Sequence, residues 1–475
     1  MRFLCNLIGQ SGVESESLFL HLTFSHGLYW PINGTILSLP TSDPIPLLSQ
    51  YRKADQSVKM KLCTSLGLLF LTLAVNPSQS FQAPSPASSN KVVTPKTEVQ
   101  AATTLRDVTL VPTTPSSERT NAPFAIPMQG EIMKMLPKES FQIDTKTSLF
   151  YFGVDFLAVA SSMGFLNLVV NSDVYHSLPM IAQALTVAPL QVLTGFCMWL
   201  MWCIGHDAGH SLISKSKPWM NDVVGEIAHS MLCLTPFVPW QLSHRKHHLN
   251  HNHLTRDFSH QWFIREQYDD LPDWMKLSYK TRNIQLPILY LVYLLLGVPD
   301  GGHVFLYGKM WEGESDQLKA RGALSSVLSM LTAGSLWATM GTANFAVVCF
   351  APWLVMSFWL FMVTYLQHHS DDGKLYTDDS WSFQKGAFET VDRSYGKWVD
   401  RMSHHMMDGH VIHHLFFEKV PHYRLEKATA ALVEGLEQGG KSHLYKRIET
   451  PNFSQEIIKQ FNDNWFFVNE ENIVR

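Results

Sequence analysis

The sequence predicts an all-α integral membrane protein whose four transmembrane helices form two hairpins. Charged residues make up only 16% of the 475-residue chain, below the roughly 25% that is usual for soluble proteins. Four stretches are long and apolar enough to cross a bilayer at about 1.5 Å per residue. They are residues 149–170, 179–203, 322–341 and 344–366.

The distribution of basic residues predicts how these spans are oriented. The links within the hairpins, 171–178 and 342–343, contain no Lys or Arg, whereas the long segments that follow each hairpin are rich in both. By the positive-inside tendency, we expect both long segments on one side of the membrane, cytosolic or stromal. A shorter apolar stretch, 286–298, is expected to lie at the interface or to be re-entrant. Asp155 lies within the first span, and we expect it to snorkel or to face the bundle.

The chain before the first span has the composition of a leader. Residues 1–59 show no periodicity and are interpreted as an upstream extension. Residues 60–81 have the basic start and apolar core of a signal peptide, and residues 82–125 have the Ser, Thr, Pro and Ala content of a disordered transit or linker segment. This pattern resembles the plastid leaders of algae with secondary plastids; an ordinary secretory signal, and hence the endoplasmic reticulum, is the alternative. The main domain is expected at 126–448 and a surface tail at 449–475.

Composition also excludes some classes of function. The net charge is −4 and the chain has no long Lys/Arg run, so it lacks the electrostatic footprint of a nucleic-acid-binding protein. Its six cysteines include no C-x-x-C pair, so neither a disulfide framework nor a thiolate metal site is indicated.

Histidine is the informative residue, because 18 of the 22 histidines fall between His206 and His422. They form three motifs that lie near the ends of spans. In the first, His206 and His210 are four residues apart, which places both imidazoles on one face of a helix that continues past the second span.

The other two motifs share the spacing H-x-x-H-H, in which all three imidazoles fall within about 100° of a helical wheel and can converge. The topology places all three motifs on one side of the membrane, so eight imidazoles are expected to meet at one site facing the aqueous side. The additional residues are His244, His247 and His248 in the second motif and His410, His413 and His414 in the third.

Histidine clusters suit zinc or another transition metal as well as iron. A metal transporter, however, places its ligands near the bilayer midplane, whereas the predicted spans contain no histidine. A membrane enzyme acting on an unactivated methylene needs an oxidant, because such a group has no acidic proton and no leaving group. Eight or nine imidazoles can hold two iron ions and leave positions for dioxygen. Asp207 is expected to orient a ligand imidazole, and His251 and His253 are interpreted as surface residues.

These motifs resemble the membrane fatty acid desaturases, specifically the methyl-end (delta-12 and omega-3) acyl-lipid branch. The resemblance covers roughly residues 150–435. It departs from many relatives at Ala208, where they carry Cys, which leaves the flanking histidines unchanged. The matching segments are Gly205-His206-Asp207-Ala208-Gly209-His210, Trp240-Gln241-Leu242-Ser243-His244-Arg245-Lys246-His247-His248, Asp408-Gly409-His410-Val411-Ile412-His413-His414-Leu415-Phe416 and Pro421-His422-Tyr423.

The resemblance implies desaturation of an acyl chain of a membrane lipid with dioxygen and two electrons at an Fe2+/Fe3+ centre. The third motif begins with His410 rather than Gln and no His-Pro-Gly-Gly haem segment appears, unlike desaturases that carry a fused cytochrome. An external donor is therefore expected, ferredoxin in a plastid or cytochrome b5 in the endoplasmic reticulum. A hydroxylase or acetylenase on the same scaffold and, from another class, a metal transporter are the alternatives.

If each of two irons is to be held by four or five nitrogens, eight histidines leave one iron a ligand short. His368 follows the last residue of the fourth span, as the first motif follows the second span, and it is the expected ninth ligand. His369 is turned about 100° away on the same helix. His404 is the rival, with the alternative role of hydrogen-bonding a ligand.

Overall fold

The computed structural model describes residues 126–257, 263–280, 302–370, 372–449, 467–468 and 470–475. The chain divides into two units, Met1–Asn90 and Lys91–Arg475, and all described residues belong to the second. The predicted upstream extension, signal peptide and linker lie outside the described residues. The apolar stretch 286–298 lies outside them as well.

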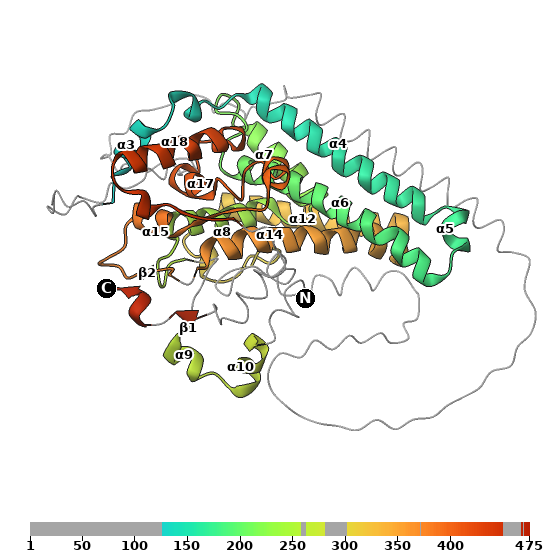
Figure 1. Cartoon of the computed structure of the whole chain (residues 1–475). Coiled ribbons are helices and arrows are strands. Elements are labelled where there is room, and N and C mark those ends of the chain that lie inside the picture. The colour runs from blue at the N-terminus through green and yellow to red at the C-terminus, as the bar shows by residue number, and fades with distance from the viewer. Residues whose placement is uncertain (1–125, 258–262, 281–301, 371, 450–466, 469) are drawn as a thin grey trace, which may run out of the picture. The chain divides into compact units, whose positions relative to one another are not determined.

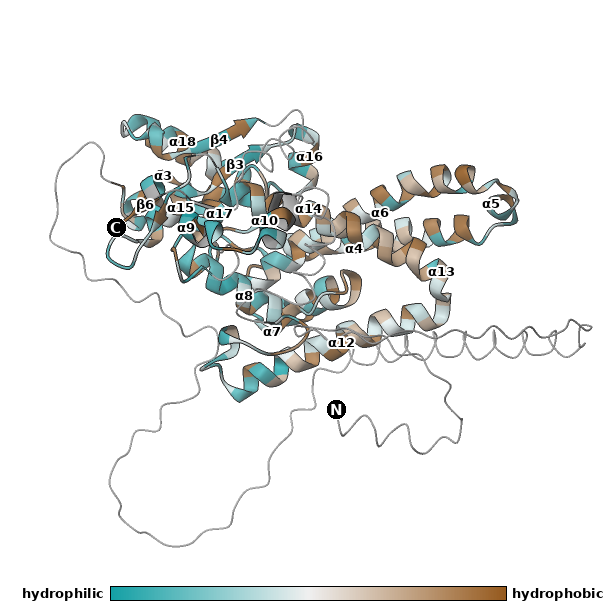
Figure 2. Cartoon of the chain, turned by 90° about the horizontal axis from the view of Figure 1, so that it is seen from below, coloured by the Kyte–Doolittle hydropathy of each residue, from teal (hydrophilic) through white to brown (hydrophobic). Residues whose placement is uncertain are grey.

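Within the part of the chain that the structure describes, four helices are long and apolar enough to cross a membrane, as the sequence predicts. Figure 2 shows hydrophobic residues concentrated along the long helices, while the region around α17 and α18 is more hydrophilic. The fourth span is continuous from Thr342 to His368 but includes a π-helical turn. The elements are α4 (Thr145–Val170), α6 (Met180–Gly209), α12 (Asp316–Met340), and the succession α13 (Thr342–Phe345), η4 (Ala346–Phe350) and α14 (Ala351–His368).

Local chemistry sets where these helices begin and end. The Asp144 side chain accepts a hydrogen bond from Lys146 N at the start of α4, and Ser315 Oγ accepts one from Leu318 N at the start of α12. α12 ends at Met340 and is capped by Gly341, whose φ of 77° is accessible to glycine at little steric cost.

The first and fourth long helices contact each other at the end that carries α5. α5 (Asp173–Ser177) joins α4 to α6. Asn344 in α13, at the start of the fourth span, donates a hydrogen bond from Nδ2 to Asn171 Oδ1, directly after α4, at 2.9 Å. Both α5 and α13 lie at the end of the long helices that is away from α17 and α18 (Figure 2). The histidine motifs therefore gather at the opposite end.

α6 is the central helix, in contact with both α4 and α14. Its glycines permit close approach: a Cβ at Gly195 would lie 2.4 Å from Val355 Cβ of α14, and one at Gly205 would lie 2.3 Å from His229 Cδ2. Trp199 and Trp202, both 1% exposed, fill the core around it. This packing fixes the last turn of α6, which carries the first motif.

Shorter helices cover the motif-bearing end (Figure 1). α8 carries the second motif and packs against α12, while α17 carries the third and packs against α15 and α18. Besides the spans and α5, the α-helices among the described residues are α3 (Gln129–Met135), α7 (Trp219–Gly225), α8 (Phe237–Asn250), α9 (Arg265–Asp269), α10 (Asp273–Lys280), α15 (Phe383–Glu389), α16 (Lys397–Met402), α17 (His410–Phe416) and α18 (Leu425–Gln438). The π-helical η2 spans Glu226–Leu232, and 3-10 turns lie at Lys138–Phe141, Lys309–Trp311, His422–Arg424, Ser442–Leu444 and Glu470–Asn472.

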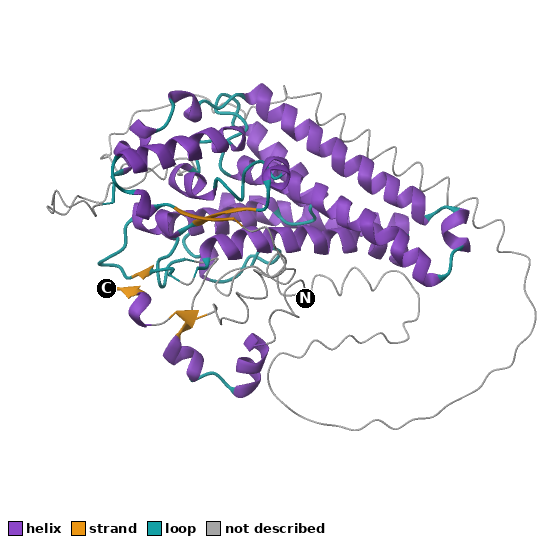
Figure 3. Ribbon diagram, in the orientation of Figure 1, coloured by secondary structure: helices purple, strands orange, loops and turns teal. Residues whose placement is uncertain are grey.

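The fold is mostly helical, and the described residues also contain short strands that the all-α prediction did not anticipate (Figure 3). They form parallel pairs between segments far apart in the sequence, which period-based reasoning does not detect. The expected surface tail is involved, because Ile473 is 7% exposed and pairs with Leu375. The pairs are β1 (Phe263–Ile264) with β5 (Phe467–Val468), β2 (Leu375–Tyr376) with β6 (Ile473–Val474), and β3 (Val391–Ser394) with β4 (Lys446–Glu449).

Candidate metal centre

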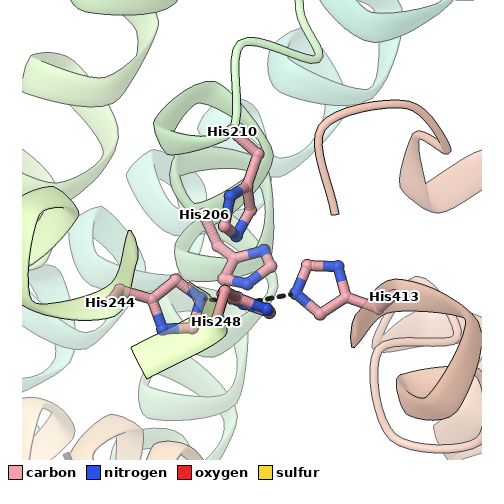
Figure 4. Close-up of side chains that lie close together, drawn as sticks. All are labelled: His206, His210, His244, His248 and His413. Carbon is pink, nitrogen blue, oxygen red and sulfur yellow. Dashed lines mark hydrogen bonds between the residues drawn. The ribbon is translucent and has the colours of Figure 1, made fainter. Parts of the chain in front are cut away.

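Two groups of buried histidines form where the long helices end. In the first group, five side chains each offer a nitrogen, and these nitrogens all lie within 4.8 Å of one another. Figure 4 shows the five rings converging from α6, α8 and α17. The group consists of His206, His210, His244, His248 and His413.

The second group contains His247, His368 and His414, whose nitrogens also lie within 4.8 Å of one another. His410 adjoins it, because its Nε2 lies 3.3 Å from His368 Nε2. The two groups are neighbours: the rings of His248 and His414 are 4.2 Å apart between centroids. All eight motif histidines and His368 are therefore brought together.

Each H-x-x-H-H motif is divided between the groups, which corrects the expectation that its three imidazoles converge on one point. His244 and His248 join the first group while His247 joins the second. In the third motif, His410 and His414 face the second group and His413 the first. Residues four apart share a helix face, and the residue at i+3 is turned about 100° from its neighbour at i+4.

The nitrogen separations suit a shared cation. His248 Nε2 lies 3.0 Å from both His244 Nε2 and His413 Nε2, and His247 Nε2 lies 3.2 Å from His368 Nε2. Nitrogens that bind one ion at about 2.1 Å lie about 3 Å apart.

The tautomers of the histidines in and beside the second group also favour a shared cation there. The Nδ1–H of His247 donates to Asp257 Oδ1 at 2.8 Å, and that of His410 donates to Met406 O at 3.0 Å. The Nε2 atoms of both rings therefore present lone pairs, and both point toward His368 Nε2. Both ring nitrogens of His414 lack a hydrogen-bond partner among the described residues. A metal ion fits this donor set.

Burial keeps these imidazoles neutral, as metal binding requires. It lowers the pKa of His247 and of His410 from the ordinary 6.5 to about 3. The pKa values of the other motif histidines on α8 and α17 are well below 6.5, first through burial and then through neighbouring imidazoles; these are His244, His248, His413 and His414.

Carboxylates contact the candidate ligands from outside. Asp257, 4% exposed, accepts the hydrogen bond from His247, and Asp207 Oδ1 lies 3.7 Å from His206 Nδ1. The sequence indicates Asp207 as a residue that orients an imidazole, but it does not indicate Asp257. Asp257 follows the second motif after a turn that includes Asn252 at a φ of 55°, and spacing alone does not reveal such a turn.

His404 lies further out than expected. Its Nε2 donates to Asp155 Oδ2 at 2.7 Å and its ring packs on that of His422, 4.6 Å between centroids. It therefore reaches the candidate ligand His206 only through His422 and Asp207. Asp155, 3% exposed, faces the bundle, the second of the two expected alternatives.

The expectation that His251 and His253 are surface residues is wrong. They are 0% and 2% exposed. His251 donates from Nδ1 to His248 O at 2.6 Å and its ring lies 4.9 Å from that of His414. His253 pairs with Asp378 instead, at 3.2 Å. The turn after α8 folds both side chains inward, which the polar local sequence does not indicate.

Comparison with known proteins agrees with this geometry. The model of the fatty acid desaturase family matches residues 182–447. The chain is 30% identical over 353 residues to a Delta(12) fatty acid desaturase of Caenorhabditis elegans, covering 72% of this chain and 85% of the relative. It is 32% identical over 326 residues to an sn-1 acyl-lipid omega-3 desaturase (ferredoxin) of Nostoc sp., covering 67% and 82%. It is 33% identical over 320 residues to an acyl-lipid omega-3 desaturase (cytochrome b5) of the endoplasmic reticulum of Arabidopsis thaliana, covering 65% and 76%.

Proposed function

This chain belongs to the fatty acid desaturase family, and we propose that it introduces a cis double bond toward the methyl end of an unsaturated C16 or C18 acyl chain in a membrane lipid. It is an integral membrane oxidoreductase of the methyl-end branch. The observation that carries the proposal is the convergence of nine buried histidines in two adjacent groups at the ends of α6 and α14.

Two iron ions are the proposed cofactor. The first would be held by His206, His210, His244, His248 and His413, and the second by His247, His368, His410 and His414. Bound iron would activate dioxygen, which with two electrons and two protons would take two hydrogens from adjacent methylenes and leave as two waters.

The protein positions the candidate ligands and buries them away from water. The last turns of α6 and α14 hold three of the imidazoles at the junction between apolar helices and the polar covering helices. Asp257 fixes the tautomer of His247, so that Nε2 faces the second group. Because the site adjoins membrane helices, an acyl chain reaches it from the lipid, while electrons arrive from the aqueous side.

Expression in a host that lacks polyunsaturated lipids tests the reaction. We expect a new methyl-end double bond, delta-12 or omega-3, in the acyl chains of membrane lipids. Fatty-acid profiling distinguishes this from hydroxylated or triple-bonded products, and metal flux without lipid change would indicate a transporter. Unchanged lipids, with the protein present and a reduced donor supplied, would contradict the proposal.

We propose that both hairpin links face the side of the membrane opposite to the metal centre. The contact between Asn171 and Asn344 supports this arrangement, since it joins the end of the first span to the start of the fourth. In vesicles, protease should cut the C-terminal segment and leave the links protected, or the reverse in inverted vesicles. Cleavage of both from one side would contradict the topology.

We propose plastid membranes and a ferredoxin-like donor, with the endoplasmic reticulum and cytochrome b5 as the alternative. The sequence of the leader supports the first, and relatives whose names carry each donor leave both open. A fluorescent fusion that begins at Met60 decides between them by its location, and retention in the endoplasmic reticulum would reverse the assignment.

A further inference from the structure

A line of buried polar residues runs from the first membrane helix toward the candidate metal centre. It begins at Asp155 in α4, whose Oδ2 accepts a hydrogen bond from His404 Nε2 at 2.7 Å. The backbone of His404 has a φ of 57°, a left-handed conformation that disfavours residues with a Cβ. The Nε1–H of Trp199 on α6 donates to Ser403 Oγ at 3.1 Å and holds this turn against the bundle.

The line continues through His422. Its ring packs on that of His404, and it is 1% exposed. Two donors of His422, the backbone N–H and Nδ1–H, both bind Asp207 Oδ2, at 2.9 and 2.8 Å. One oxygen of the Asp207 carboxylate is thereby fixed, and its other oxygen is directed elsewhere.

That other oxygen lies beside a candidate ligand. Asp207 Oδ1 is 3.7 Å from His206 Nδ1, and neither atom has a hydrogen-bond partner among the described residues. A shift of a few tenths of an ångström up to about 1 Å would close this pair to hydrogen-bond length. A carboxylate that accepts from a ligand imidazole fixes its tautomer and raises its basicity.

We propose that His422 is a positioning residue of the metal centre. Its two hydrogen bonds orient the Asp207 carboxylate toward His206, and the Asp155–His404 pair holds His422 from the membrane side. The inference rests on the proposed function, because it requires that His206 binds iron. Asp155 in the first span thereby gains a role, at a depth where a buried charge is costly unless it is paired.

Two substitutions of His422 separate this role from packing. His422→Asn places an amide nitrogen where Nδ1 of the imidazole lies and keeps the donor to Asp207. His422→Leu fills a similar volume but offers no side-chain donor. His253→Leu is the matched control, since His253 is also a buried histidine hydrogen-bonded to a carboxylate, Asp378 Oδ1.

The readouts are the iron content and the midpoint potential of purified full-length protein. We expect His422→Leu to weaken iron retention about 10- to 100-fold and to raise the midpoint potential, because a less basic ligand favours the reduced metal. His422→Asn should restore both values to near those of the wild type, and His253→Leu should leave them unchanged. If His422→Leu does not fold, Asp207→Asn tests the same link, with a raised midpoint potential expected.

Wild-type iron content and potential in folded His422→Leu would overturn the inference. Equal losses in the Asn and Leu variants would overturn it as well, since packing would then be the role of His422. A wild-type protein that binds no iron would instead overturn the proposed function, so the two failures are distinguishable.

Discussion

Replacing His368 by alanine should remove one of the two proposed irons and lower double-bond formation by at least about 100-fold. Even the loss of an outer contact to a ligand costs about 10- to 100-fold, and His368 lies closer to the centre than such contacts. Its Nε2 is 3.2 Å from that of His247 and 3.3 Å from that of His410. Iron content and fatty-acid profiles of purified protein in lipid or detergent measure both effects.

His369→Ala is the matched control. His369 is equally buried, at 3% exposed, but its ring stacks on Tyr365 at 3.8 Å and its Nδ1–H donates to Tyr365 O. Its loss should leave two irons bound. If His368→Ala retains two irons and most of its activity, His368 is not a ligand.

Acid should destabilise the metal-free protein steeply. Burial depresses the folded-state pKa of His247 and His410 to about 3 and holds the pKa values of His244, His248, His413 and His414 well below 6.5. Neutral imidazoles therefore favour the folded state, and this stability is present above the unfolded pKa of about 6.5 and is lost as pH falls toward about 3. Within this window, each such imidazole lowers the free energy of unfolding by about 1.4 kcal/mol for every unit that the pH falls. The summed loss by pH ~5.5 is on the order of 5–10 kcal/mol, comparable with the stability of a whole domain.

Thermal unfolding of chelator-treated protein in detergent checks this result. The midpoint should be nearly constant from pH ~8 to ~7 and should fall sharply below pH ~6.5. Reloading iron should move the fall to lower pH, because metal and protons compete for the same nitrogens. A metal-free midpoint that is equal at pH ~7.5 and ~5.5 would show that these imidazoles are not buried in neutral form.

The spans and the motif helices follow from local sequence. An apolar run as long as Ile181 to Ile204 has no stable place except a bilayer or a protein core, and the spacing of His206 and His210 fixes their common face on any helix. The same spacing does not divide the other two motifs, since all three imidazoles of an H-x-x-H-H run fall within about 100° on a helix. His368 was identifiable because it stands at a span end on the same side as the motifs.

Tertiary structure decided which group each face joins, because that depends on how α8 and α17 are rotated against α6. It also decided the contacts around the centre. Asp257 reaches His247 only through the turn after α8, and His251 is buried by the same turn.

His404 was identifiable as a candidate from its sequence near the third motif, but its partner Asp155 is 249 residues away in the chain. Periodicity and spacing describe only residues on one element. Contacts between elements are set by packing, which brings a carboxylate of the first span, a left-handed turn and the residue after Pro421 into one buried line beside the candidate metal centre.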